Sequence, residues 1–121
     1  MTAPPPTSAS TLSADQTRNL FAAVDLGSNS FQLLIAKYSH GQLLIVDRLR
    51  EMVRLATGLD VEQWLDQASQ DRALACLARF GGRLRDISPT RLRAVGTNTL
   101  RKAKNSKVFI SKAQRLLGHE I

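Results

Sequence analysis

The stretch FAAVDLGSNSFQLLIA, residues 21–36, decides how this chain folds. An apolar run ends at Asp25, a loop of Gly, Ser and Asn follows, and a second apolar run begins directly after the loop. Apolar runs of about four to eight residues, bounded by turn-forming residues, are typical of strands. The sequence therefore predicts strands at residues 20–25 and 31–38, joined by a tight loop.

The loop that follows Asp25 permits two interpretations. It places a carboxylate beside the backbone and side-chain groups of Gly27, Ser28, Asn29 and Ser30. A carboxylate at a strand end can hold a hydrated Mg²⁺, and hydroxyl and N–H groups bind phosphate oxygens. The same residue types are common in ordinary hairpin loops. The chemistry of the loop alone leaves both interpretations open.

Beyond the loop, the sequence predicts a small α/β domain. A third strand at residues 43–50 completes an antiparallel meander, and residues 51–59 form an irregular connector. Asp66 is the predicted N-cap of a helix that runs to residue 86. Apolar side chains recur in it every three or four residues, at Leu74, Leu77, Phe80, Leu84 and Ile87. The pair Gly81-Gly82 costs this helix about 1 kcal/mol per glycine relative to Ala, so either another element packs closely there or the helix bends.

The next segments predict a crossover to a fourth strand. Ser88-Pro89 ends the long helix, and residues 91–95 form the strand. A polar turn at residues 97–99 introduces a short helix at residues 100–103.

A final helix is predicted at residues 106–117, with Asn105 as its N-cap and Gly118 ending it. Five of its apolar residues are expected to face inward: Phe109, Ile110, Ala113, Leu116 and Leu117. Residues 119–121 are predicted to begin a fifth strand. The predicted element order is therefore β-β-β-α-β-α-(β).

A second polar loop, VGTNTLR at residues 95–101, follows the fourth strand. Thr97 and Thr99 supply hydroxyl groups near a helix N-terminus, and Arg101 can bind a phosphate with two hydrogen bonds. The alternative is an ordinary strand-to-helix turn with a surface arginine. Ligands of open α/β sheets bind beyond the strand ends, so the two loops together favour a phosphate site.

The formal net charge of +7 is concentrated in the last third of the chain. Residues 87–121 hold eight Lys and Arg and one acid, Glu120, whereas the first 86 residues hold nine residues of each sign. A basic segment of this kind indicates a phosphate-rich or polyanionic partner. It is equally compatible with a fragment whose acidic remainder lies elsewhere.

Composition excludes several classes of protein. No apolar run approaches the roughly 20 residues that span a bilayer, and the N-terminus lacks the basic and apolar regions of a signal peptide. We therefore expect a cytoplasmic protein with no membrane partner. Residues 1–18, rich in Pro, Ser, Thr and Ala, are predicted to be a disordered tail.

Individual polar and aromatic residues carry weaker signals. Cys76 lies among Ala and Leu and is predicted to be a core thiol rather than a nucleophile. His40 and His119 lie far apart in the sequence without further ligands, which argues against a metal site built on them. Trp64 and Phe109 form no ladder of aromatic residues, so nucleic-acid binding is not expected. The Gly-x-x-x-x-Gly-Lys-Ser/Thr motif of P-loop proteins is absent.

Residues 21–121 resemble the N-terminal part of the exopolyphosphatase/guanosine pentaphosphate phosphatase family. The resemblance rests on the string DLGSNSF in residues 21–36, on VRLATGL at residues 53–59, on the helix with Leu77 and Phe80, and on Thr-x-Thr-x-Arg in residues 95–103. It implies an α/β fold of the ribonuclease-H-like, actin-like ATPase superfold. Residues 19–121 would be an incomplete first domain of that fold.

The resemblance also implies a function. The family removes the terminal phosphate of inorganic polyphosphate, or the 5′ γ-phosphate of guanosine pentaphosphate, with Mg²⁺. By position, Asp25 would organise the metal, and Arg101 would bind phosphate in a loop shaped by Thr97 and Thr99. The first phosphate loop would consist of Gly27, Ser28, Asn29 and Ser30. A homodimer of the full-length protein is one possible assembly.

Two parts of the family's pattern are missing from the 121 residues. The family's catalytic Glu lies in a Ser-Gly-x-Glu-Glu-Ala-Arg segment, just after the strand whose start matches Glu120, and a Gly-Gly-Gly-Ser string later forms a second phosphate loop. We therefore expect no catalytic residue within the chain, and we expect the chain alone to be inactive. The residues that select polyphosphate or guanosine pentaphosphate are expected beyond Ile121.

Two other functions compete with this interpretation. The nucleotide-binding half of a sugar-kinase or chaperone-like ATPase would share the Asp-x-Gly-Ser loop. A non-catalytic module that binds polyanions or RNA would use the basic residues between Arg91 and Arg115.

Overall fold

The computed structural model describes residues 19–121, and the predicted disordered tail, residues 1–18, lies outside the described residues. The three predicted strands are all present, each extended by one residue at one or both ends: β1 Leu20–Leu26, β2 Phe31–Ser39 and β3 Gln42–Glu51. Consecutive strands pair antiparallel, so the predicted meander is confirmed.

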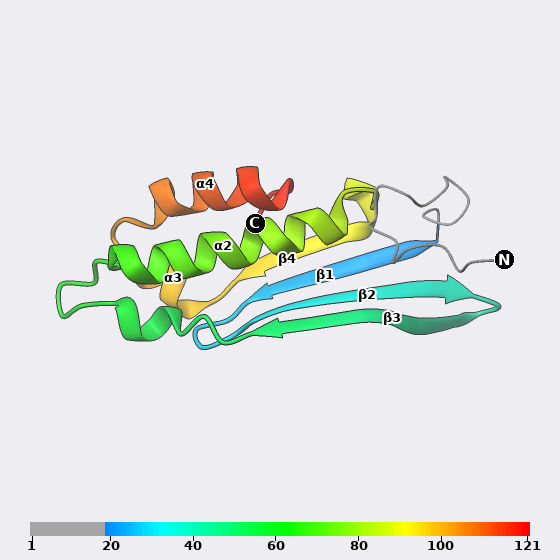
Figure 1. Cartoon of the computed structure of the whole chain (residues 1–121), viewed down its shortest axis with the longest axis horizontal. Helices are drawn as coiled ribbons and strands as arrows, with labels where there is room; N and C mark the ends of the chain where they lie inside the picture. Colours follow the sequence, from blue (N-terminus) through cyan, green and yellow to red (C-terminus); the bar gives the residue numbers. More distant parts are fainter. Residues whose placement is uncertain (1–18) are drawn as a thin grey trace, which may run out of the picture.

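A fourth strand, β4 Leu92–Gly96, pairs in parallel with β1, and the sheet has the order β3-β2-β1-β4. It begins one residue later than predicted because a 3₁₀ turn, Pro89–Arg91, precedes it. The register sets Leu26 opposite Gly96. The segments that follow β1 and β4 therefore leave the sheet at the same end (Figure 1).

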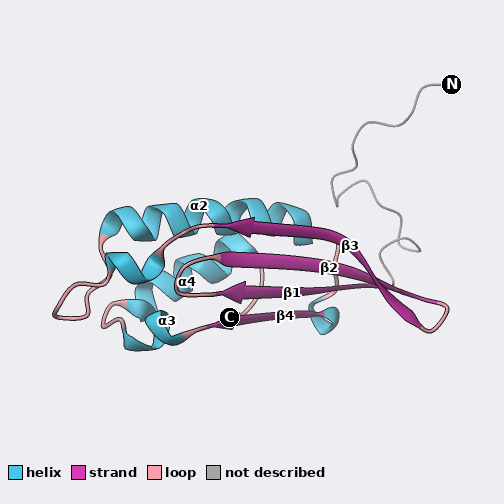
Figure 2. Cartoon of the chain, turned by 90° about the horizontal axis from the view of Figure 1, so that it is seen from below, coloured by secondary structure: helices cyan, strands magenta, loops and turns pink. Residues whose placement is uncertain are grey.

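The side chains of β1 alternate between two faces of the sheet. Leu20, Ala22, Val24 and Leu26 are buried, and the residues between them, including Asp25, are exposed. Two helices, α2 Gln67–Leu84 and α4 Ser106–Leu117, cover the buried face (Figures 1 and 2). In the described part of the chain no helix covers the other face, so Asp25 lies on the open side of the sheet.

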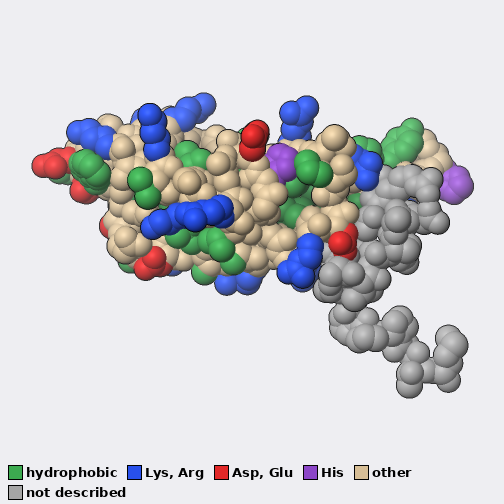
Figure 3. All heavy atoms as spheres, turned by 90° about the horizontal axis from the view of Figure 1, so that it is seen from above, with side chains coloured by type: hydrophobic (Ala, Val, Ile, Leu, Met, Phe, Trp, Pro, Cys, Tyr) green, Lys and Arg blue, Asp and Glu red, His purple; other side chains and the backbone are tan. Residues whose placement is uncertain are grey.

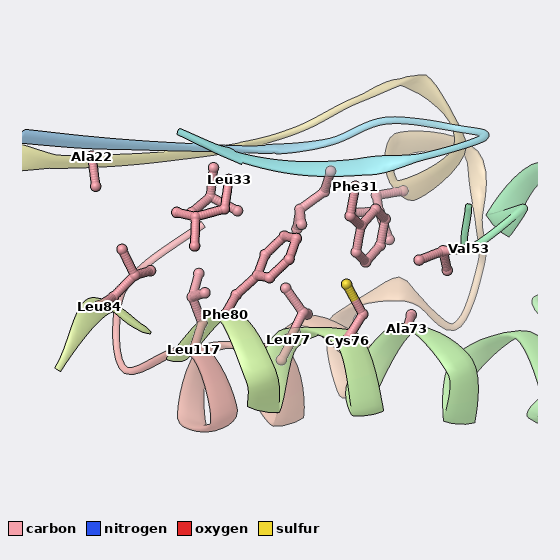
Figure 4. Close-up of a cluster of buried hydrophobic side chains, with 14 of the residues drawn as sticks. Ala22, Phe31, Leu33, Val53, Ala73, Cys76, Leu77, Phe80, Leu84 and Leu117 are labelled. Carbon is pink, nitrogen blue, oxygen red and sulfur yellow. The ribbon is translucent and has the colours of Figure 1, made fainter. Parts of the chain in front are cut away.

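Helix α2 begins where the sequence predicts, because the carboxylate of Asp66 accepts a hydrogen bond of 2.7 Å from the N–H of Ser69. It ends at Leu84, two residues before the predicted end, where the N–H of Ile87 donates to the carbonyl oxygen of Leu84 in a tight turn before Pro89. The buried side of the helix packs under the sheet (Figure 4). Its residues there are Ala73, Cys76, Leu77, Phe80 and Leu84.

Gly81 lies where α2 meets α4. A Cβ atom at Gly81 would lie 2.2 Å from the backbone oxygen of Leu116, whereas a Cβ atom at Gly82 would meet nothing within 4 Å. Of the two explanations for the glycine pair, close packing of another element is the one that applies to Gly81. Nothing in the structure explains Gly82.

Two expectations about the C-terminal helices are corrected. The short helix α3, Asn98–Lys102, begins two residues earlier than predicted. Asn105 does not cap α4: its side-chain amide donates to the carbonyl oxygen of Leu65 at 3.0 Å and accepts from the N–H of Leu65 at 2.9 Å. It joins the segment just before α2 to the segment just before α4 instead. Gly118 ends α4 in a left-handed conformation, φ 80°, as predicted.

Two further corrections concern the end of the chain. Leu116 is 42% exposed rather than turned inward, because Ala113 and Leu117 occupy the buried side of α4. Residues 119–121 form no strand. The N–H of Ile121 donates to the side-chain oxygen of Gln114 at 3.0 Å, and not to the backbone of β4. No helix in residues 19–121 combines the length and the apolar character that a membrane-spanning segment needs.

Candidate functional site

The loop of residues 27–30 is a turn that closes on itself. The N–H of Gly27 donates to the carbonyl oxygen of Ser30 at 3.1 Å, and a Cβ atom at Gly27 would lie only 2.7 Å from that oxygen. A side chain does not fit there, so the turn requires glycine. The next three N–H groups, of Ser28, Asn29 and Ser30, have no backbone acceptor within residues 19–121. They are available to an anion.

The second polar loop lies against the first, as the two strand ends predict. The N–H and the hydroxyl of Thr97 donate to the carbonyl oxygen of Leu26 at 3.2 and 2.9 Å. The hydroxyl of Thr99 donates to the hydroxyl oxygen of Ser28 at 2.8 Å. Thr99 is only 5% exposed, so its hydroxyl positions Ser28. Arg101 follows on α3 with an exposed side chain.

A third segment, residues 54–56, contacts the same loop. The sequence analysis did not assign this segment to the site. The N–H of Arg54 donates to the carbonyl oxygen of Asn29 at 2.7 Å, and the N–H of Ala56 donates to that of Ser28 at 2.8 Å. Arg54 itself is exposed and directly precedes a 3₁₀ turn, Leu55–Gly58. The string VRLATGL, which contributes to the family resemblance, is the signal in the sequence, but it gave Arg54 no role in the site.

Arg50 approaches the loop from the end of β3. Its Nε lies 3.4 Å from the hydroxyl oxygen of Ser30, which is a long hydrogen bond. In the sheet, Arg50 pairs with Gln32, and Gln32 pairs with Asp25. Neighbouring strands lie about 4.8 Å apart, so Arg50 and Asp25 are about two strand spacings apart on the open face of the sheet.

This arrangement occurs in a chain with recognisable relatives. The sequence model of the Ppx/GppA phosphatase family matches residues 34–121, well over half of the chain. The chain belongs to the Ppx/GppA phosphatase family. The family resemblance stated from the sequence motifs is therefore confirmed.

Two curated relatives match most of the chain. The guanosine-5′-triphosphate,3′-diphosphate pyrophosphatase of Pseudoalteromonas atlantica is 48% identical over 102 residues, which are 84% of this chain and 20% of the relative. The protein of the same name from Pseudoalteromonas translucida is 44% identical over 104 residues, 86% of this chain and 21% of the relative. The chain thus spans about one fifth of the length of these relatives.

Solved structures of the Ppx/GppA family have the same fold. The Aquifex aeolicus PPX-GPPA enzyme superposes with a TM-score of 0.74 at 27% identity, covering 84% of this chain and 35% of the other. A Cytophaga hutchinsonii exopolyphosphatase gives 0.76 at 23% identity, covering 84% and 32%. The predicted α/β, actin-like ATPase fold is confirmed, and the chain corresponds to its N-terminal part.

By the family resemblance, the carboxylate of Asp25 would hold the metal. It is exposed, and no cation pairs with it among residues 19–121. Those residues contain no group of three or more His, Cys, Asp or Glu that could enclose a metal. Mg²⁺ commonly binds through one or two carboxylates while keeping several waters and taking phosphate oxygens of the substrate. The single exposed carboxylate of Asp25 is compatible with this way of binding Mg²⁺, in which water and phosphate oxygens supply most of the ligands.

Glu51, at the end of β3, is already engaged. Its carboxylate forms an ion pair of 2.6 Å with Arg79 on α2. The neighbouring thiol of Cys76 and the guanidinium of Arg79 lower the pKa of Glu51, although its partial burial opposes this. Burial raises the pKa of Cys76, and the thiol is fully enclosed, so the predicted core thiol is confirmed.

The basic residues of the last third are spread over the surface. Figure 3 shows the helix-bearing face, on which the Lys and Arg side chains form separate groups rather than one continuous patch. The six Lys and Arg residues that follow β4 are all exposed: Arg101, Lys102, Lys104, Lys107, Lys112 and Arg115. This face offers no continuous basic surface to a long polyanion.

Proposed function

We propose that these residues form the first phosphate-binding part of a phosphoanhydride hydrolase. Its substrate is inorganic polyphosphate or guanosine pentaphosphate, from which it removes the terminal phosphate. The observation that carries the proposal is the loop of residues 27–30 in a chain of the Ppx/GppA family. Three of its N–H groups have no backbone acceptor among the described residues, and the loop is bonded to the side chain of Arg50, the backbone of Arg54 and the Thr97–Arg101 loop.

Each group in the site has a role in this proposal. The N–H groups of Ser28, Asn29 and Ser30 bind oxygens of the terminal phosphates, and the Ser28 hydroxyl adds a donor. Its oxygen already accepts from Thr99, so its own hydrogen is free for the substrate. Arg101 neutralises phosphate charge from the side of α3. Cleavage of a phosphoanhydride depends mainly on positioning and charge neutralisation, which these groups provide.

Asp25 would hold Mg²⁺ in this proposal. Its carboxylate stands at the end of β1 without a protein cation among the described residues, and water and phosphate oxygens would complete the coordination. Bound Mg²⁺ would supply neutralisation of charge on the phosphate oxygens. The pairing of β1 with β2 and β4 fixes the position of Asp25, one residue before β1 ends and the loop begins.

Binding of tripolyphosphate to the 121-residue chain, measured by calorimetry with and without Mg²⁺, tests the site. We expect Mg²⁺-dependent binding that Asp25→Asn, Ser28→Ala and Arg101→Met each weaken by about tenfold, the equivalent of one charged hydrogen bond. Arg115→Met is the matched control, because it removes an exposed cation of α4 outside the three segments. Equal binding by the site variants and the control would overturn the proposal.

Hydrolytic activity is tested with the full-length protein that contains these residues. We expect release of phosphate from polyphosphate or guanosine pentaphosphate, and a loss of activity of about a hundredfold in Asp25→Asn if the carboxylate holds the metal.

The two alternative functions predict other results. A kinase-like or chaperone-like ATPase would be protected against heat by ATP and not by polyphosphate. A polyanion-binding module would keep its affinity in Asp25→Asn and lose it in Lys102→Glu/Lys104→Glu.

A further inference from the structure

We propose that the groove between β3 and α2 binds an extended acidic segment of a partner polypeptide, which adds to the sheet as a strand beside β3. The two elements run side by side along one edge of the molecule (Figure 2) and border a cavity of about 460 Å³. The proposed function makes no use of this groove, so the inference adds an interaction surface and does not depend on that function.

Strand β3 offers a free edge to a further strand. In the described residues it is an edge strand of the sheet, in the order β3-β2-β1-β4. The N–H of Arg48 donates to the side chain of Asp47 at 2.9 Å and not to β2. Backbone groups alternate in direction along a strand, so those of Arg48 and Arg50 face outward. Of the usual protections of an edge, β3 has a bulge at Val46 but neither proline nor lysine, which leaves residues 47–51 as the regular edge.

The floor of the groove is apolar and has open space. Leu49 of β3 is half-buried, and Phe80 of α2 is 1% exposed. Gly82 also borders the groove, and a Cβ atom there would meet nothing within 4 Å. A glycine inside a helix costs about 1 kcal/mol relative to Ala, and no contact within the described residues requires this one. An occupied groove explains it, because the apolar side chains of a ligand would take the space.

Two ion pairs frame the groove. Arg79 pairs with Glu51 at 2.6 Å, and Arg83, one helical turn further along α2, pairs with Asp47. Leu49 lies midway between the two acids along β3, so the apolar floor opens between the ion pairs. The pairs join the helix to the strand, and the groove is therefore formed before a ligand binds. A preformed site lowers the entropic cost of binding.

The charge around β3 favours an acidic partner. Four of the eight residues that line the groove are arginines, and only one is an acid. On the opposite face of β3, the exposed side chains of Arg48 and Arg50 lie two residues apart. A strand that pairs with β3 places every second side chain beside them, and opposite charges across a strand pair are stabilising. The segment that fits best alternates acidic residues on this face with apolar residues toward the groove.

Selection of random decapeptides, displayed on phage, against the 121-residue chain supplies the probe. We expect enriched peptides in which acidic and apolar residues alternate. One enriched peptide, made synthetically, is then titrated into the chain by calorimetry. Proline in place of a central residue of the peptide removes a backbone N–H. We expect it to abolish binding, because the affinity of an added strand comes from main-chain hydrogen bonds.

Gly82→Leu separates binding from stability. The leucine side chain fills the groove, so we expect the peptide to bind about tenfold more weakly, which corresponds to the usual cost of overpacking. Because leucine is a better helix former than glycine, this variant should melt at the same or a higher temperature than the parent.

Arg48→Glu tests the charge of the strand edge. We expect the peptide to bind about fivefold more weakly, because an attractive cross-strand pair is lost. Lys107→Glu is the matched control. It makes the same change of charge at an exposed residue of α4, outside the groove, and should bind the peptide as the parent does.

The inference is overturned if no peptide is enriched, if Gly82→Leu binds the peptide as the parent does, or if Arg48→Glu and Lys107→Glu weaken binding equally. Two other occupants of the groove would also overturn it. A second copy of the chain would appear in sedimentation as a dimer that Gly82→Leu abolishes. The chain's own residues 1–18, which include one acid and one arginine, would displace the enriched peptide when added as a synthetic peptide.

Discussion

The hydroxyl of Thr99 donates a hydrogen bond of 2.8 Å to the hydroxyl oxygen of Ser28, a residue 71 positions earlier in the chain. Thr99 is buried, and Ser28 is half-buried at the surface of the loop. The bond joins the segment after β4 to the loop after β1. It also fixes the oxygen of Ser28, so that the hydrogen of this hydroxyl can point outward to a ligand.

Removal of the Thr99 hydroxyl should weaken phosphate binding more than it weakens the fold. We expect Thr99→Val, which keeps the shape of the side chain, to lower tripolyphosphate affinity by about fivefold, because a neutral hydrogen bond contributes about 1 kcal/mol. Thr99→Ser keeps the donor and should bind as the parent does. Calorimetric titration of the three proteins measures this, and equal affinities for Val and Ser would contradict it.

The adjacent glycines of α2 should respond in opposite directions to the same substitution. Gly81→Ala places a Cβ atom against the backbone of Leu116, and we expect the free energy of unfolding to fall by about 1–3 kcal/mol, the usual cost of overpacking. Gly82→Ala meets open space and should raise it by up to about 1 kcal/mol through helix propensity. Urea unfolding measures both, and a shift of the same sign in both variants would disprove the packing argument.

The N-cap of α2 should make stability depend on pH in the acid range. Hydrogen bonds from the hydroxyl and the N–H of Ser69 lower the pKa of Asp66 in the folded state. A lowered folded pKa gives stability that is complete above the unfolded pKa and is lost as pH falls through the folded pKa.

Asp66→Asn is the matched control, because Asn caps helices without titrating. The difference in free energy of unfolding between the parent and this variant should be constant near neutral pH and should shrink below about pH 4, the ordinary range of Asp. Unfolding curves between pH 7 and pH 3 test this. A difference that stays constant over the whole range would exclude Asp66 as the titrating group.

The single thiol should react slowly while the protein is folded. Burial raises the pKa of Cys76, and the neighbouring carboxylate of Glu51 adds to the effect. Because the thiolate is the reactive form, we expect an aromatic disulfide reagent at pH 8 to label Cys76 much more slowly in buffer than in denaturant. Cys76→Ser gives the background. Labelling at the same rate in both solutions would mean that the helix opens there.

Much of the fold follows from local patterns in the sequence. The strand β1, the cap at Asp66 and the helix end at Gly118 each depend on residues within a few positions, and each prediction is confirmed. The prediction that Asn105 caps α4 was wrong because the hydrogen-bond partner of its side chain is distant in the sequence. An Asn before a helix is a good cap, but its amide bonds to Leu65, which is 40 positions away.

The candidate site divides in the same way. The sequence by itself determined the composition of the two polar loops and their position after strand ends, because strand periodicity and turn chemistry are local properties. Only the tertiary structure decided which groups meet there. The parallel pairing of β1 with β4 brings Thr99 to Ser28, and the path of the connector brings Arg54 to Asn29. Such contacts depend on the packing of the whole sheet against α2 and α4, which no stretch of neighbouring residues encodes.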